Sequence, residues 1–433
     1  MKNPLFHLTL LGVVLVVCGC RGRGESPLIP TPVLYTDSTI DPFDYLDPND
    51  RSPQVEVFYA TNRKRTHREG TYYGNAMDNR VHVGRTVVRL GEEDMTWEAL
   101  RQASSVAERD EMVPVTLEQV EEHGVLRASL RGKKQRKDES MGDAQFAAAI
   151  NVALAQRDNK SINIYVHGIR VDFDHGAVLG GQFRHFAMRE GVTLAFDWAS
   201  RQKLLYYLGD VKRARRSVPD LVALLDFLAR ETDAETISII SWSAGAPLHS
   251  AAMVELRQRH PTWTSEQLFE HYRIDEAIFA ASDMDFLDFV KQFKAFYDLP
   301  RSIMVTICHE DEALVLTRRL YGKSRLGSAD LADLADDEIE ELARHYADKI
   351  DIVDVTRSQE HANVDAGLTG HHYWFNSTWV NTDLLVTIYL DLPPEQRGLT
   401  CDNEHKSLWY FDANYPAQVV EAVKDVTGLK NLE

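Results

Sequence analysis

The sequence is poor in cysteine and in positive charge. Only four of its 433 residues are cysteine, which is too few for a disulfide framework in a chain of this length. Cys18 and Cys20 lie near the amino terminus, so only Cys308 and Cys401 remain in the body of the chain. The formal net charge is −18. Because an acidic protein repels phosphate backbones, we expect no nucleic-acid partner.

The sequence also lacks the motifs of several common cofactor and metal sites. No Gly-x-Gly-x-x-Gly opens a helix, and no His-Glu-x-x-His is present. Gly322-Lys-Ser resembles the end of a phosphate-binding loop, but Thr317 stands where the first glycine of that loop belongs. The sequence therefore predicts neither a metal ion nor an organic cofactor.

The amino terminus carries an apolar stretch, Leu8–Val17, behind Lys2. This stretch is shorter than the roughly 20 residues of a membrane-spanning helix, but it suits the core of a signal peptide. The tetrad that ends at Cys20 resembles a bacterial lipobox, with the small Gly19 before the cleavage point. Cleavage at Cys18 fits less well, because Val17 would occupy the position that requires a small side chain.

We therefore expect residues 1–19 to be a lipoprotein signal peptide and Cys20 to carry the lipid, a diacylglyceryl group with palmitate-like chains. Such an anchor places the protein on a membrane of the bacterial cell envelope, facing an extracytoplasmic space. The alternative is an ordinary secretory signal peptide with incidental cysteines.

The remaining chain divides by composition. Residues 20–53 are rich in proline and predict an extended tether. Residues 54–395 predict one catalytic domain with a polar insertion around residues 92–145, in which the charge run Lys133–Lys137 is expected to be a solvated loop. Residues 396–433 are expected to be a C-terminal extension packed on that domain.

Short apolar runs alternate with helical patterns throughout the domain. Leu221, Leu224, Leu225 and Leu228 follow the spacing of a helix that packs one face on a sheet. This alternation predicts an α/β fold with a largely parallel central sheet and helices on both faces. The expected strands are residues 55–60, 85–90, 162–167, 193–198, 236–241, 274–281, 302–308 and 350–355.

The pentapeptide Ser241-Trp-Ser-Ala-Gly245 stands between an expected strand and an expected helix. This is the sequence context of a nucleophile elbow, in which a sharp turn presents a serine hydroxyl above the sheet. Ser243 is therefore the candidate nucleophile. The alternative is a serine-rich turn without chemical meaning.

A second glycine turn, Val166-His-Gly168, follows an earlier strand and suits an oxyanion hole. We expect the backbone amides of Ile169 and Ala244 to be its two donors. His167 is expected to be structural, because the histidine of a hydrolase triad comes after the nucleophile in this fold.

As a set, these motifs resemble a group of bacterial α/β hydrolases of the esterase/lipase superfamily that contain a domain of unknown function. The resemblance spans roughly residues 55–390, and it implies an α/β-hydrolase fold and hydrolysis of an ester-like bond. Where this group more often has His-Ser-Met-Gly, the chain has Trp242-Ser-Ala-Gly245, so we expect a different pocket. The segments that carry the resemblance are Phe58–Arg63, Val166–Gly168, Phe196–Ser200, Tyr207 with Asp210, Ser241–Gly245, Asp311–Leu314 and Gly370–Tyr373.

The acid of the triad has several candidates after the nucleophile. Asp311 follows the second strand beyond Ser243 and begins the Asp-Glu-Ala-Leu segment of the resemblance, so we place it first. Asp283 and Asp285 follow the first such strand and are its rivals. Each of these aspartates also suits a helix cap.

The histidine of the triad should follow the last core strand. His361, His371 and His372 qualify by position, and His361 lies in a polar stretch. The Gly-His-x-Tyr pattern of the resemblance falls on His371, so we expect His371 to be the base. If these residues were extended, only one of two adjacent histidines would face Ser243.

The sequence therefore predicts a serine hydrolase that cleaves a small-molecule or lipid ester through Ser243, Asp311 and His371. Two alternatives remain open. One is a catalytically silent hydrolase fold that serves as a surface interaction module. The other is an acyltransferase that uses the same three residues.

Overall fold

A computed structural model describes residues 26–427 of the chain, apart from residues 37–40, 42, 45, 69, 138, 203–205 and 359–370. The expected signal peptide, Cys18, Cys20 and His361 lie outside the described residues. Among the described residues, Cys308 and Cys401 do not form a disulfide. Within the described part of the chain, no helix combines the length and the apolar character needed to cross a membrane.

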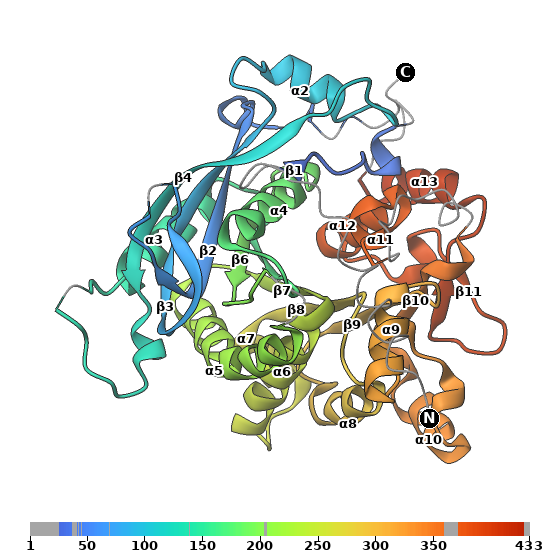
Figure 1. Ribbon diagram of the computed structural model, residues 1–433. Coiled ribbons are helices and arrows are strands. Elements are labelled where there is room, and N and C mark those ends of the chain that lie inside the picture. Colours follow the sequence, from blue (N-terminus) through green and yellow to red (C-terminus); the bar gives the residue numbers. More distant parts are fainter. Residues whose placement is uncertain are drawn as a thin grey trace, which may run out of the picture.

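One twisted sheet runs through the molecule (Figure 1), and within the described residues it contains twelve strands in the order β1-β4-β3-β2-β6-β5-β7-β8-β9-β10-β12-β11. Neighbouring strands from β2 to β12 in this order are parallel. The outer pairs are antiparallel: β1 with β4, β4 with β3, β3 with β2, and β12 with β11. The strands are β1 (Ser26–Pro27), β2 (Gln54–Arg65), β3 (Tyr73–Leu90), β4 (Pro114–Val125), β5 (Ser161–Val166), β6 (Val192–Asp197), β7 (Thr236–Trp242), β8 (Ile274–Ala280), β9 (Ser302–Ile307), β10 (Asp351–Asp354), β11 (Thr400–Cys401) and β12 (Leu408–Tyr410).

Helices cover both faces of this sheet, as Figure 1 shows for α5 and α6 on one side and α4 and α12 on the other. They are α2 (Trp97–Ala103), α3 (Asp143–Ala155), α4 (Phe173–Phe186), α5 (Tyr207–Glu231), α6 (Ala246–Arg259), α7 (Ser265–Tyr272), α8 (Phe286–Phe296), α9 (Glu312–Tyr321), α10 (Asp336–His345), α11 (Tyr373–Asn376), α12 (Thr378–Leu390) and α13 (Tyr415–Thr427). Every residue of β5 and β6 is buried, because helices shield parallel strands on both faces. The predicted α/β-hydrolase fold is confirmed.

Alternating side chains of the central strands point into two separate hydrophobic cores, one on each face of the sheet. Ile237 and Ile239 of β7 pack with α3, α5, α6 and α8, whereas Ile240 and Trp242 pack with α4 and α12. The period of two that defines a strand thus sets which helices each residue meets. The leucine pattern at residues 221–228 forms the buried stripe of α5, as predicted.

The polar insertion around residues 92–145 contains regular secondary structure. It contains α2, the start of α3, and β4, which pairs antiparallel with β3 along most of its length. Opposite charges face each other across this pair: Glu121 accepts from Arg85 at 2.7 Å, and Glu118 pairs with Arg89. Glu122 of β4 pairs with Arg65 at the end of β2. These pairs explain why a charged segment forms a strand. Residues 133–137 of the charge run are exposed and lie outside any helix or strand.

The prediction of an extended tether over residues 20–53 is wrong for the part of this range that the structure describes. Leu28, Leu34, Tyr35 and Phe43 are all buried, and the Tyr35 hydroxyl donates to the Phe186 carbonyl at the end of α4 at 2.7 Å. Proline content suggested an extended chain, but the intervening apolar side chains bury against the domain. At the other end, β12 joins the sheet beside β10 and α13 packs into the same core.

Candidate active site

The turn between β7 and α6 holds Ser243 in a strained conformation. The φ angle of Ser243 is 53°, a left-handed value that a side-chain-bearing residue adopts at a cost. The turn leaves no room for a side chain at residue 245, because a Cβ atom on Gly245 would lie 2.6 Å from the Val166 carbonyl oxygen. The small residues of the pentapeptide thus allow α6 to start against the end of β5. This is the strand-turn-helix geometry of a nucleophile elbow.

Three predicted residues meet above the carboxyl ends of the parallel strands. His371 Nε2 lies 2.9 Å from Ser243 Oγ, and His371 Nδ1 lies 2.7 Å from Asp311 Oδ2. Since a carboxylate only accepts, Nδ1 carries the proton and Nε2 is the acceptor for the serine hydroxyl. Asp311 is fully buried and its second oxygen accepts from the Leu314 amide at 3.1 Å, which caps α9.

The electrostatic environment of His371 favours its protonated form. Burial lowers the pKa of His371, but the carboxylates of Asp311 and Asp283 outweigh that effect and raise the pKa from its ordinary value. The side chain of His371 is 12% exposed. A partly accessible imidazole with a raised pKa is suited to take up a proton during a reaction.

The two rival aspartates bind other partners. Asp285 caps α8 through the Asp288 amide at 2.9 Å and pairs with Lys323. Asp283 lies beside the site: its amide donates to the Ser243 carbonyl at 3.1 Å, and its Oδ2 accepts from the Tyr207 hydroxyl at 2.7 Å. Burial raises the pKa of Asp283, against the effect of Arg325.

His371 and His372 lie in a turn before α11 rather than on extended backbone. The turn directs His371 to Ser243, while His372 is exposed. The Trp242 ring lies 5.4 Å from each of the two imidazole rings and 5.2 Å from the Phe375 ring, measured between centroids. Trp242, which precedes Ser243, therefore packs against the histidine turn.

Residues 143–385 match the model of a family described as alpha/beta hydrolase of unknown function (DUF900). The chain belongs to this family. The matched region contains the elbow, the buried aspartate and the histidine turn, so the whole hydrogen-bonded array lies within the family's own domain. A search of curated proteins found no match.

Two solved structures are weakly similar to this DUF900 hydrolase. Esterase B from Lactobacillus rhamnosis, inhibited with a C6-C4 SN3 compound, is 14% identical over 39% of this chain and 63% of the esterase chain, with a TM-score of 0.26. A lipase-esterase related protein from Clostridium acetobutylicum is 11% identical over 64% of this chain and 96% of its own, with a TM-score of 0.21. Likenesses of this strength carry no information about the reaction.

The predicted oxyanion turn of this family member lies against Ser243. A Cβ atom on Gly168 would lie 2.9 Å from the Cβ of Ser243, so only glycine allows the turn to come this close. Ile169 and Arg170 follow in the turn, and Arg170 has a φ angle of 64°. On the other side, Ala244 directly follows Ser243 in the short turn that leads into α6. The two segments that carry the predicted donors thus both adjoin Ser243.

Sequence reasoning missed the contacts beside Ser243 in which the buried Asp283 binds the half-buried Tyr207 and the buried Arg325. Tyr207 was part of the motif set, but its partner is distant in sequence and only the fold brings them together. No cluster of three or more histidine, cysteine, aspartate or glutamate side chains suited to a metal ion occurs among the residues that the structure describes.

Proposed function

We propose that this DUF900 hydrolase cleaves a carboxylic ester through an acyl-enzyme on Ser243. The observation that carries the proposal is the hydrogen-bonded chain from Asp311 through His371 to a serine held at positive φ. Each link has the geometry of its role: 2.7 Å for orienting the imidazole and 2.9 Å for removing the serine proton.

In the first half of the reaction, His371 Nε2 takes the proton of Ser243 while Oγ attacks the acyl carbon. The carbonyl oxygen becomes an oxyanion, which the amides of Ile169 and Ala244 stabilise. The imidazolium then gives its proton to the alcohol oxygen as the bond from the acyl carbon to that oxygen breaks. An acyl-serine and a free alcohol result.

In the second half, water replaces the alcohol. His371 removes a proton from the water, the resulting hydroxide oxygen attacks the acyl-serine, and Ser243 leaves with the proton from the imidazolium. The products are a carboxylic acid and the original serine. Asp311 remains ionised and stabilises the imidazolium in both halves.

The proposed substrate class is a small-molecule or lipid ester with an apolar acyl group. The aromatic rings of Trp242 and Phe375 support this choice, because they flank the histidine turn where the acyl group would lie. We further propose that a lipid on Cys20 anchors the protein in the bacterial cell envelope. The lipobox-like tetrad ending at Cys20 supports that location.

A fluorophosphonate probe on the purified protein tests the proposal. The parent protein should be labelled and Ser243→Ala should not be labelled. Ser250→Ala is the matched control, because Ser250 is a buried serine on α6 whose hydroxyl donates to Gln292. Absence of labelling in the folded parent would instead support a surface interaction module. Transfer of the acyl group to an added alcohol in preference to water would support an acyltransferase.

A further inference from the structure

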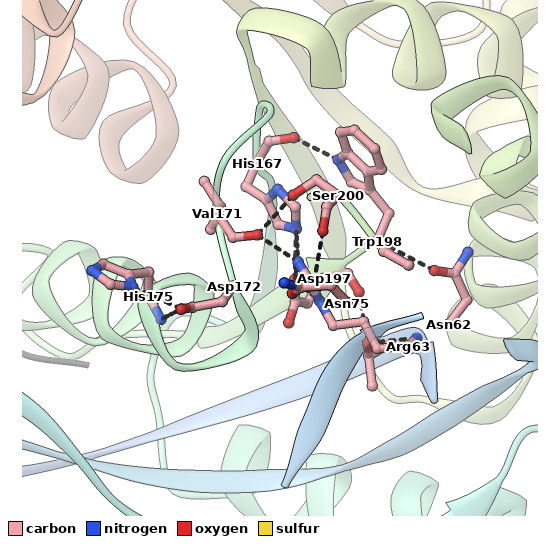
Figure 2. A network of polar contacts seen from close by, with 12 residues as sticks. Asn62, Arg63, Asn75, His167, Val171, Asp172, His175, Asp197, Trp198 and Ser200 are labelled. Carbon is pink, nitrogen blue, oxygen red and sulfur yellow. Dashed lines mark hydrogen bonds and ion pairs between the residues drawn. The ribbon is translucent and has the colours of Figure 1, made fainter. Parts of the chain in front are cut away.

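A buried ionic cluster lies beneath the turn that carries the expected oxyanion donor (Figure 2). It consists of Arg63 from the end of β2, Asp197 from the end of β6 and His167 just after β5. All three side chains are at most 1% exposed. None of them belongs to the array of Asp311, His371 and Ser243.

Strand register explains why these residues meet. Thr61 pairs with Asp197 between β2 and β6, and Val166 pairs with Phe196 between β5 and β6. Because the three strands are parallel neighbours, their carboxyl ends lie at one edge of the sheet. This is the edge at which the turn after β5 passes next to Ser243.

Asp197 joins the other two side chains. Its Oδ1 lies 2.9 Å from both Nε and Nη2 of Arg63 and 2.6 Å from Nε2 of His167. A buried ion pair of this kind often adds no net stability compared with apolar side chains of the same size. Stability alone is therefore a weak explanation for placing it at this edge.

Two side chains of this cluster and the neighbouring Trp198 bind three carbonyl groups of the turn. Trp198 Nε1 donates to the His167 carbonyl at 2.6 Å, and His167 Nδ1 lies 2.7 Å from the Gly168 carbonyl oxygen. Arg63 Nη2 donates to the Val171 carbonyl, also at 2.7 Å. Figure 2 shows these side chains converging on the backbone of the turn.

The bond to the Gly168 carbonyl fixes the next amide. In a planar trans peptide, the C=O of residue 168 and the N–H of residue 169 point in opposite directions. A histidine that holds the Gly168 carbonyl towards the buried cluster therefore turns the Ile169 N–H away from the cluster. A carbonyl only accepts, so Nδ1 of His167 must carry a proton for this bond.

We propose that His167 is a positioning residue that sets the direction of the Ile169 amide in the oxyanion hole, and that Asp197 and Arg63 hold its ring in place. This inference rests on the proposed function, because an oxyanion forms only if Ser243 attacks a carbonyl. It assigns a functional reason to a histidine that the sequence suggests is structural.

The test compares four variants in hydrolysis of a short-chain p-nitrophenyl ester. His167→Ala should lower kcat by about 10²- to 10³-fold, the effect of losing one oxyanion donor, with KM changed less than about threefold. His167→Asn should regain at least about tenfold of that loss, because its Nδ2 lies near the position of histidine Nδ1 and still donates to Gly168. His167→Gln reaches Asp197 instead and should regain less.

His185→Ala is the control for loss of a buried histidine. His185 is fully buried, and its Nε2 lies 2.8 Å from Ser104 Oγ. It lies at the far end of α4, about 20 Å along the helix from the turn. His185→Ala should therefore lower the thermal midpoint but leave kcat unchanged.

A folded His167→Ala variant with kcat near that of the parent would overturn the inference. If His167→Ala does not fold, the comparison of Asn with Gln decides: equal kcat for these two variants would also overturn it. Parent and Ser243→Ala enzymes are assayed alongside. If the parent shows no turnover that depends on Ser243, both the proposed function and the inference are wrong. If the parent is active but the His167 variants keep its kcat, only the inference is wrong.

Discussion

Replacing Asp311 with asparagine tests the proposed triad most directly. Asparagine is as good a helix cap as aspartate, so the 3.1 Å bond to the Leu314 amide that begins α9 should survive in Asp311→Asn. The variant loses the negative charge 2.7 Å from His371 Nδ1. It thereby loses the group that orients the imidazole and stabilises its cation.

We expect kcat of Asp311→Asn to fall about 10⁴-fold, as in other serine hydrolases that lose the triad carboxylate. At 1.36 kcal/mol for each factor of ten, this is about 5.5 kcal/mol of transition-state stabilisation. The assay is steady-state hydrolysis of a p-nitrophenyl ester, with urea unfolding to show that each variant is folded.

Asp283→Asn is the matched control, because Asp283 is also a buried aspartate beside Ser243. Its carboxylate binds Tyr207 and Arg325, and it acts on His371 only through space. We expect Asp283→Asn to lose less than about tenfold in kcat. The reverse ranking, with both variants folded, would refute the reasoning and transfer the triad acid to Asp283.

Three further predictions concern the base, the pH profile and the anchor. His371→Ala should lower kcat by about 10⁴-fold, whereas His372→Ala should lose less than about tenfold; the opposite order would make His372 the base. Because nearby carboxylates raise the pKa of His371 and the base must be neutral, kcat/KM should fall with decreasing pH around a midpoint above about 6.5. Asp283→Asn should shift that midpoint to lower pH, and an unchanged pH profile would contradict the electrostatic argument. Cys20→Ser should release the protein from the membrane fraction, whereas release by Cys18→Ser alone would place the lipid on Cys18.

The elbow and the histidine turn were accessible from the sequence because their signals are local. A strand, a small-x-Ser-x-Gly pentapeptide and a helix are contiguous in the chain, so Ser243 needed no tertiary information. His371 could be ranked before His372 by its motif. Its turn conformation could not be predicted, because the rings of this turn pack on Trp242, which is more than a hundred residues away in the chain.

The sequence was least informative where polar residues form buried or paired structure. The strand β4 is rich in glutamate, and its pairing depends on arginines of β3 that lie about thirty residues earlier. The prediction for the amino-terminal segment was wrong because its buried residues are apolar but form no periodic pattern. Leu34 and Tyr35, for example, belong to a short apolar group between prolines. In both cases the partner surface exists only after the sheet has formed.

Arg63, His167 and Asp197 show why some of the motif set remained without a role at the sequence level. Each lies at or just beyond the end of a different strand, and no spacing in the chain relates them. Their contact follows from the strand order β2-β6-β5, which brings three carboxyl ends together. In the same order, β7 follows β5, so the cluster and Ser243 lie on opposite sides of one short turn. The strand order that places Ser243 at this edge therefore also places the cluster of Arg63, Asp197 and His167 next to the proposed oxyanion turn.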